Sequence, residues 1–150
     1  MAYSGKFRPK NLSKYNGDPN KITYRSSWEA WLMKWCDQSA SVISWSSEEV
    51  IIPYFSNADG KRRRYFMDFY VKMVTGDVFL FEVKPEKECR PPVMPSTNTA
   101  KAKKNFISEM YTWQVNTDKW KAAQALCESK GWNFKIITEV TLKSHFGWRG

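Results

Sequence analysis

The sequence predicts an α/β fold in which a small mixed β-sheet with a central hairpin is flanked by helices. Segments 65–73 and 77–84 alternate apolar and polar residues around Thr75-Gly76, the pattern of a β-hairpin. Apolar residues also recur at helical spacing early in the chain. The expected order is helix, three strands, two helices and strand, which is typical of a single α/β domain.

The composition indicates a folded, basic domain. The chain has 150 residues, the size of one domain, and 42% of them are hydrophobic, enough for a substantial core. Its 24 Lys and Arg outnumber its 15 Asp and Glu, for a formal net charge of +9. This excess favours a polyanionic partner, because neutralised phosphates release counterions. A basic protein without such a partner remains the alternative.

The cysteines and apolar runs exclude several classes of protein. Cys36, Cys89 and Cys127 are odd in number and form no C-x-x-C pair, so we expect free thiols in a reducing compartment. The first ten residues contain no apolar segment of the kind that marks a signal peptide. No apolar run approaches the roughly 20 residues that span a membrane, so we expect no membrane partner.

We divide the chain into a basic N-terminal arm, residues 1–25, and a single domain, residues 26–150. The arm is rich in Lys and Arg and is interrupted by glycine and proline. Four apolar residues favour docking on the domain, although a disordered tail stays open: Phe7, Leu12, Tyr15 and Ile22.

The first helix is predicted by an apolar stripe that begins just after a capping pattern. Ser26 followed three residues later by Glu29 fits a capping box. The stripe consists of residues spaced three and four apart: Trp28, Trp31, Leu32, Trp35 and Cys36.

The remaining elements follow from local signals. Segment 48–55 is predicted as a strand that Pro53 places at a sheet edge, and a proline-rich loop follows the hairpin. Segments 101–114 and 117–130 are predicted as two helices, the second capped by Thr117 or Asp118 and ended by Gly131. Segment 133–138 is a further strand, and the form of the tail stays undefined.

The register of the hairpin decides which side chains meet. With Val74-Thr75-Gly76 as a three-residue loop, Gly76 takes the left-handed position and Met73 faces Asp77. Three pairs then share one apolar face: Phe69 with Phe81, Val71 with Phe79, and Met67 with Val83. A two-residue loop would separate the charged residues described next.

In this register, Asp68, Glu82 and Lys84 share the face opposite the apolar pairs. Two adjacent carboxylates repel each other unless a cation joins them, and their hard oxygens suit Mg²⁺ or Mn²⁺. Lys84 is placed to hold an attacking water or to neutralise charge on a phosphate. The alternative is a solvent-exposed strand with unrelated charges.

The spacing of these residues resembles the signature of the PD-(D/E)XK nucleases: an acid on one strand, then acid-x-Lys on the next. Met67 stands where the family usually has proline. The resemblance implies a restriction-endonuclease-like core and Mg²⁺, with Mn²⁺ as a substitute. It also implies metal ligands at Asp68, Glu82 and the main-chain carbonyl of Val83.

The stretch Arg25-Ser26-Ser27-Trp28-Glu29 resembles the first helix of phage junction-resolving enzymes and of a transposon end-cleaving endonuclease subunit. In those families a helical glutamate completes the metal site. The resemblance therefore implies a catalytic role for Glu29, and the capping role is the alternative; both can hold together.

A longer resemblance covers nearly the whole chain. MAYSGKF, ITYRS, RRYFMD and VNTDKWKAAQ are similar to the head completion proteins of T-even-type tailed phages. This implies a role in late virion assembly with double-stranded DNA and head or portal-proximal proteins as partners. It places the chain in the host cytoplasm or the virion head.

Other basic and polar residues extend the predicted site. Lys61, Arg62, Arg63 and Arg64 lead into the Asp68 strand and are expected to contact the DNA backbone. Lys101, Lys103 and Lys104 are weaker candidates for phosphate contacts. Gln114 occupies the region where related nucleases carry an accessory polar residue. For both basic runs, a solvated surface is the alternative.

Two functions are consistent with the sequence. The first is a Mg²⁺-dependent DNA endonuclease that hydrolyses phosphodiesters through Glu29, Asp68, Glu82 and Lys84. The second is a structural head-completion protein that binds or plugs packaged DNA without cutting it.

Overall fold

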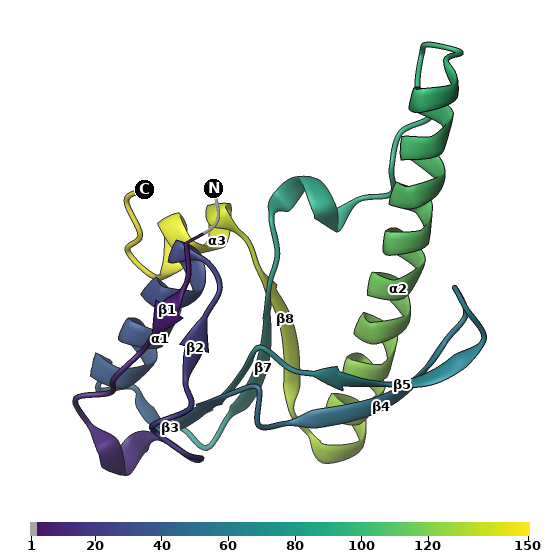
Figure 1. Ribbon diagram of the computed structural model, residues 1–150. Helices are drawn as coiled ribbons and strands as arrows, with labels where there is room; N and C mark the ends of the chain where they lie inside the picture. The colour runs from purple at the N-terminus through teal and green to yellow at the C-terminus, as the bar shows by residue number, and fades with distance from the viewer. Residues whose placement is uncertain (1–2) are drawn as a thin grey trace.

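The computed structural model describes residues 3–150, and its centre is a four-stranded sheet. The strands lie in the order β3 (Val42–Ser47), β6 (Phe69–Met73), β7 (Val78–Val83) and β8 (Asn133–Ile137). The first three are antiparallel, whereas β8 runs parallel to β7. The mixed sheet with its central β6–β7 hairpin is the predicted fold class (Figure 1).

The predicted hairpin register is confirmed at the centre of the sheet. Phe69 pairs with Phe81 and Val71 with Phe79. The Met73 N–H donates to Asp77 O at 2.8 Å, and Gly76 has a φ of 91°, so the loop has three residues. Alternation along β7 therefore places Glu82 on the face opposite Phe81.

The predicted single strand 65–73 is wrong, because the chain turns at Met67 and Asp68. β5 (Lys61–Phe66) pairs with β4 (Ile51–Ser56) in a separate two-stranded ribbon, and β6 begins at Phe69. Met67 consequently packs in a cluster with Leu80, not with Val83 on the Phe69 face as predicted. The main-chain N–H of Glu48 donates to the carbonyls of both Met67 and Asp68 at this break.

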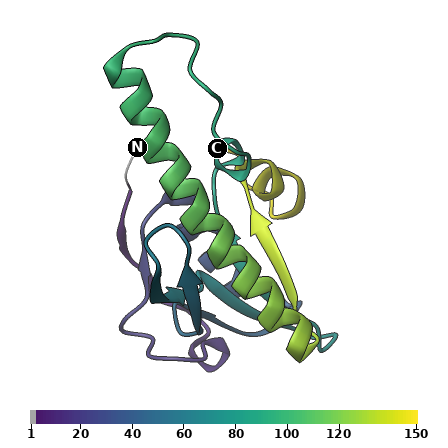
Figure 2. The same cartoon turned by 90° about the vertical axis from the view of Figure 1, so that its right-hand side faces the viewer.

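Both faces of the central sheet are covered. One face packs against α1 (Ser27–Gln38) and α3 (Glu139–His145), whose buried residues include Leu32, Met33 and Leu142. The other face lies under α2 (Ala100–Lys130) and the β4–β5 ribbon, through Ala123, Cys127 and Ile52 among others. Figure 2 shows α2 running diagonally across this second side.

The first helix begins as predicted. The Ser26 Oγ accepts a 3.1 Å hydrogen bond from the Glu29 N–H and so caps α1. The predicted apolar stripe faces the core: Leu32 and Cys36 are fully buried, and the stripe's other members pack partly buried against the same cluster: Trp28, Trp31 and Trp35.

The two helices predicted at 101–114 and 117–130 form one 31-residue helix, α2. Asn116 and Thr117 cost only about 0.7 kcal/mol or less each relative to alanine, far below the roughly 3 kcal/mol of proline. Helical hydrogen bonding therefore continues: the Thr117 Oγ1 donates back to Gln114 O, and Asp118 binds Asn57 instead of capping a helix. Thr99 and Gly131 cap the two ends.

The N-terminal segment packs on the domain. β1 (Gly5–Lys6) pairs with β2 (Thr23–Tyr24), and η1 (Leu12–Lys14) leads to Tyr15 at the edge of the sheet. Tyr15 and Ile22 are buried in the core, and Phe7 packs against it, as their apolar character predicts; Leu12 remains exposed.

β3, β4 and the tail also differ from what the sequence predicted. β3 was not predicted, because its serines are typical of a loop; two of them, Ser46 and Ser47, are buried around the fully buried Trp45. β4 lies at 51–56 rather than 48–55, with Pro53 in a two-stranded ribbon as an edge position requires. The tail contains α3, followed by residues 146–150 without regular structure. In residues 3–150 the structure has no helix that combines the length and apolar character of a membrane span.

Candidate active site

A cleft of about 350 Å³ opens where the tip of α1, the break between β5 and β6, and the end of β7 meet. It contains every residue predicted to act in catalysis, and the chain brings them from three separate parts of the fold. The lining residues are Arg25, Glu29, Glu48, Arg64, Tyr65, Phe66, Asp68, Glu82, Val83, Lys84 and Lys119.

Asp68 is bound to the strand that carries the second acid. The Val83 N–H donates a 2.8 Å hydrogen bond to Asp68 Oδ2. Burial, and next the charge of Glu82, raise the pKa of the Asp68 carboxyl well above its ordinary value, while the Val83 hydrogen bond opposes the rise. The charges of the two carboxylates therefore act on each other, as expected for neighbouring acids.

Glu82 is buried and held from two sides. The Tyr65 hydroxyl donates to Glu82 Oε1 at 2.6 Å, and Lys84 Nζ lies 3.7 Å from Glu82 Oε2. Burial raises the pKa of Tyr65, so this hydroxyl keeps its proton and remains a donor. Lys84 supplies a cation beside the carboxylate pair and is itself only 21% exposed.

Glu29 takes part in only half of the predicted capping box, through its N–H to Ser26, and its side chain lines the cleft. Its Oε1 accepts from the Arg25 N–H at 3.2 Å, one residue before the Ser26 N–H that a strict capping box uses. Burial raises the pKa of the Glu29 carboxyl, and the charges of Glu48 and Glu82 add to the rise. Glu29 therefore lies within electrostatic reach of the acid pair.

The sequence did not predict that Arg25 and Glu48 form an ion pair in the cleft. Arg25 Nη1 lies 2.7 Å from Glu48 Oε1, and this ion pair closes one side of the cleft. Glu48 has a φ of 57°, the single positive φ at a non-glycine position among residues 3–150. Left-handed backbone normally favours glycine or asparagine. A glutamate at position 48 therefore gave no reason to predict this conformation.

Tyr65 and Lys119 were also missed, since neither belongs to the motif. Tyr65 is fixed by pairing with Ile52 in the ribbon, which turns its ring inward beneath Glu82. Lys119 reaches the cleft from α2 and lies 5.4 Å from the Tyr65 ring centroid. These contacts depend on how the ribbon packs on β7 and how α2 packs on the ribbon.

Among the residues predicted to bind DNA and the accessory Gln114, only one lines the cleft. Arg64 lines the cleft, and Arg62 and Arg63 line a neighbouring groove, whereas Lys61 is exposed at the start of β5. Gln114 donates to Asp118 at 3.0 Å and supports the turn between β4 and β5.

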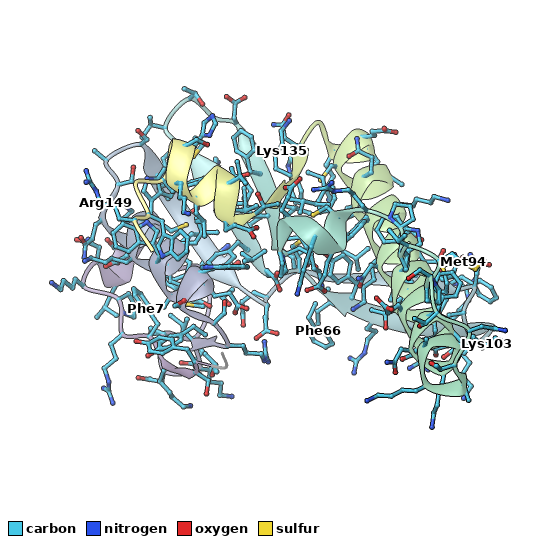
Figure 3. The ribbon with its side chains drawn as sticks, turned by 90° about the horizontal axis from the view of Figure 1, so that it is seen from above. Phe7, Phe66, Met94, Lys103, Lys135 and Arg149 are labelled. Atoms are coloured by element: carbon cyan, nitrogen blue, oxygen red, sulfur yellow. The ribbon has the colours of Figure 1, made fainter. Side chains whose placement is uncertain are left out.

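Three lysines stand far from the cleft. Lys101, Lys103 and Lys104 lie in the part of α2 that projects beyond the rest of the domain (Figure 1). Lys104 precedes Lys119 by 15 residues, about 22 Å along a helix. Figure 3 likewise places Lys103 at the opposite end of the view from the sheet.

The donor set of the cleft fits a hard divalent cation. Asp68 and Glu82 present carboxylate oxygens beside Val83, and their repulsion in a buried place is relieved by positive charge. In residues 3–150, no three His, Cys, Asp or Glu side chains already converge as a complete ligand cluster. Cys36, Cys89 and Cys127 are free thiols, as predicted.

Comparisons with known proteins agree with this geometry. Residues 39–139 match the family described as TnsA-like endonuclease N terminal. This segment includes Asp68, Glu82 and Lys84, and α1 with Glu29 precedes it. The whole chain is also 56% identical over 150 residues to the head completion nuclease of Enterobacteria phage T4, covering 99% of that protein. The chain therefore belongs to the TnsA-like endonuclease family and is a relative of the phage T4 head completion nuclease.

Proposed function

We propose that this protein is a divalent-metal-dependent DNA endonuclease that acts in completion of the phage head. The observation that carries the proposal is the buried pair Asp68–Glu82 with Lys84 at 3.7 Å, in a cleft lined by further cations. The name of the T4 relative and the endonuclease family support the activity and the stage of assembly.

The metal of this proposal is Mg²⁺, with Mn²⁺ as a substitute. Asp68, Glu82 and the main-chain carbonyl of Val83 would hold it, and Glu29 would support this set from α1. When bound, the ion supplies charge that polarises the scissile phosphate and promotes ionisation of the attacking water.

The protein's own residues orient the reactants. Tyr65 fixes one oxygen of Glu82, so the other faces Lys84. The Lys84 ammonium can then hold water next to the phosphate or stabilise the charge that develops on it. Arg64 and Lys119 add positive charge at the mouth of the cleft, where the DNA backbone enters.

The partners of this proposal are double-stranded DNA and proteins of the head or its portal region. Assembly would occur in the host cytoplasm, before or as the protein joins the virion head. The net charge of +9 supports DNA binding through counterion release.

The test is plasmid cleavage by purified protein with Mg²⁺ or Mn²⁺. We expect nicking or linearisation that stops with chelator and with Asp68→Ala, while the circular dichroism spectrum is retained. If the pure protein never cuts, or Asp68→Ala cuts equally well, the proposal is wrong. Assembly of phage heads with Asp68→Ala tests whether infectious particles require cleavage. If the particles are normal, the protein has a structural role.

A further inference from the structure

The β4–β5 ribbon has an exposed outer face that combines apolar and basic side chains. The pairing of Ile51 with Phe66, Pro53 with Arg64 and Phe55 with Arg62 places these six residues on one face. Ile51, Phe55 and Phe66 are 45%, 51% and 41% exposed on this face, and neighbouring exposed apolar residues of this kind often mark an interaction site.

Phe66 stands at the border between two hollows. It lines the catalytic cleft, and it also lines a groove of about 770 Å³ that continues between the ribbon and α2. Arg64 lies 5.4 Å from the Phe66 ring centroid and borders the same two hollows. In Figure 3 the Phe66 ring projects away from the ribbon between the sheet and α2.

The groove carries uniform positive charge and a second exposed ring. Its cations are Arg62, Arg63, Arg64 and Lys119, and none of the described residues that line it is acidic. Tyr111 contributes its ring from α2 and is 48% exposed. Arg63 is partly neutralised by Asp59, so Arg62, Arg64 and Lys119 carry most of the free charge.

Phosphate contacts explain the cations but not the rings. In an intact duplex the base faces are stacked on each other, and a protein surface meets mainly phosphates, sugars and base edges. Exposed aromatic rings beside a basic groove are typical of proteins that hold unpaired nucleotides, whose base faces are free to stack on them.

We propose that the groove binds an unpaired DNA segment that adjoins the phosphate to be cut, with bases stacked on Phe66 and Tyr111. The preferred substrate is then DNA with a single-stranded overhang rather than an intact duplex. This inference rests on the proposed endonuclease function and specifies its substrate class.

The test measures binding separately from cleavage. Fluorescence anisotropy in chelator compares a blunt duplex with the same duplex carrying a ten-nucleotide 5′ or 3′ overhang. We expect the wild type to prefer one overhang by about 5- to 150-fold, the range that stacking of one base gives. Phe66→Ala with Tyr111→Ala should remove the preference, because it weakens binding of the overhanging DNA more than binding of the blunt duplex.

Two further variants sharpen the comparison. Phe66→Trp keeps a stacking surface, so it should retain the preference. Phe55→Ala removes the same kind of ring from the same ribbon face and should also retain it, because Phe55 lies nearer the ribbon tip than the cleft. Thermal unfolding checks that all variants fold.

The inference is overturned if the wild type binds blunt and overhanging DNA equally, or if the double variant weakens both to the same degree. It is also overturned if light scattering shows that the double variant changes the oligomeric state, since the face would then be a protein interface. Overhang preference without plasmid cleavage would reject the proposed endonuclease function alone, and cleavage without the preference would reject this inference alone.

Discussion

The main-chain N–H of Val83 lies 2.8 Å from Asp68 Oδ2, and this hydrogen bond joins the first acid of the nuclease signature to the acid-x-Lys segment. Asp68 lies where the chain passes from the ribbon into the sheet, whereas Glu82 and Lys84 belong to the end of β7. The contact therefore sets the position of the first acid even though the backbone at Asp68 is not part of a strand.

The first prediction concerns Asp68→Asn. Replacing a metal ligand should lower the cleavage rate by at least about 100-fold, beyond the 10- to 100-fold typical of residues that only support ligands. The variant should nonetheless be at least as stable as the wild type in chelator, because the wild-type carboxyl is buried beside Glu82. Plasmid cleavage and thermal unfolding in chelator measure the two effects.

The stability difference should depend on pH with a defined sign. Because the folded pKa of Asp68 is raised, the folded state binds more protons than the unfolded one, and acidification removes the penalty. The advantage of Asp68→Asn in chelator should therefore shrink as pH falls toward the unfolded pKa of about 4. Asp77→Asn, an exposed acid in the same hairpin, serves as control. A wild type more stable than Asp68→Asn at neutral pH would contradict the argument.

The second prediction concerns Tyr65→Phe. It removes the donor to Glu82 Oε1 and leaves a buried carboxylate oxygen without that partner, at a cost of about 1–3 kcal/mol. The Mg²⁺ concentration for half-maximal cleavage should rise about tenfold or more, since Glu82 loses its orientation. Urea unfolding and a Mg²⁺ titration are the measurements.

Tyr70→Phe is the matched control for Tyr65→Phe. Tyr70 lies on β6 and packs edge-on against the Trp132 ring. Removing the Tyr70 hydroxyl should therefore leave the cleft unchanged. An equal shift of the Mg²⁺ requirement in both variants would show that Tyr65 does not position Glu82.

The third prediction separates Gln114 from Asp118. Asp118 is buried and accepts from the Asn57 N–H at 2.8 Å and the Asn57 side chain at 2.9 Å, so Asp118→Ala should lower the free energy of unfolding by about 2–3 kcal/mol. Gln114→Ala removes one supporting hydrogen bond and should cost about 1 kcal/mol or less.

The cleavage rate decides whether Gln114 is an accessory active-site residue. Because its amide points to Asp118, Gln114→Ala should cut DNA within about twofold of the wild type, or about 0.4 kcal/mol in activation free energy. A drop of tenfold or more in a folded Gln114→Ala protein would restore the role that the sequence resemblance implied.

The sequence was informative where one local pattern determined the structure. Hairpin alternation with Gly76 in the loop was sufficient to place Phe69 opposite Phe81 and so to bring Asp68 and Glu82 together. The Ser26 cap and the apolar stripe likewise predicted where α1 begins. Such signals depend on a few neighbouring residues and survive without tertiary information.

The remaining features depend on contacts between distant segments. Ser47 of β3 is buried against the distant Tyr15, whose hydroxyl accepts from the Ser47 N–H at 3.1 Å. Inside α2, Asp118 binds the distant Asn57 and therefore does not cap a new helix. Tyr65 reaches Glu82 from β5 of the ribbon, and Lys119 reaches the cleft from α2. The helix and strand propensities of neighbouring residues do not predict these contacts.

The last prediction concerns the strained backbone at Glu48. A left-handed residue with a β-carbon costs roughly 1–2 kcal/mol, and strain of this kind is often retained at functional sites. The ion pair with Arg25 is partly exposed and offsets at most about 1 kcal/mol. Glu48→Gly should therefore be about 1 kcal/mol more stable than Glu48→Ala, which loses the ion pair but keeps the strain.

Cleavage should fall in both Glu48 variants, because each releases Arg25 from the wall of the cleft. A glycine variant that is at least as stable as the wild type but slower would show that the strain is maintained for the site rather than for the fold. Urea unfolding and plasmid cleavage of the two variants give this comparison. If Glu48→Ala is more stable than Glu48→Gly, the left-handed backbone at position 48 imposes no strain on the folded protein.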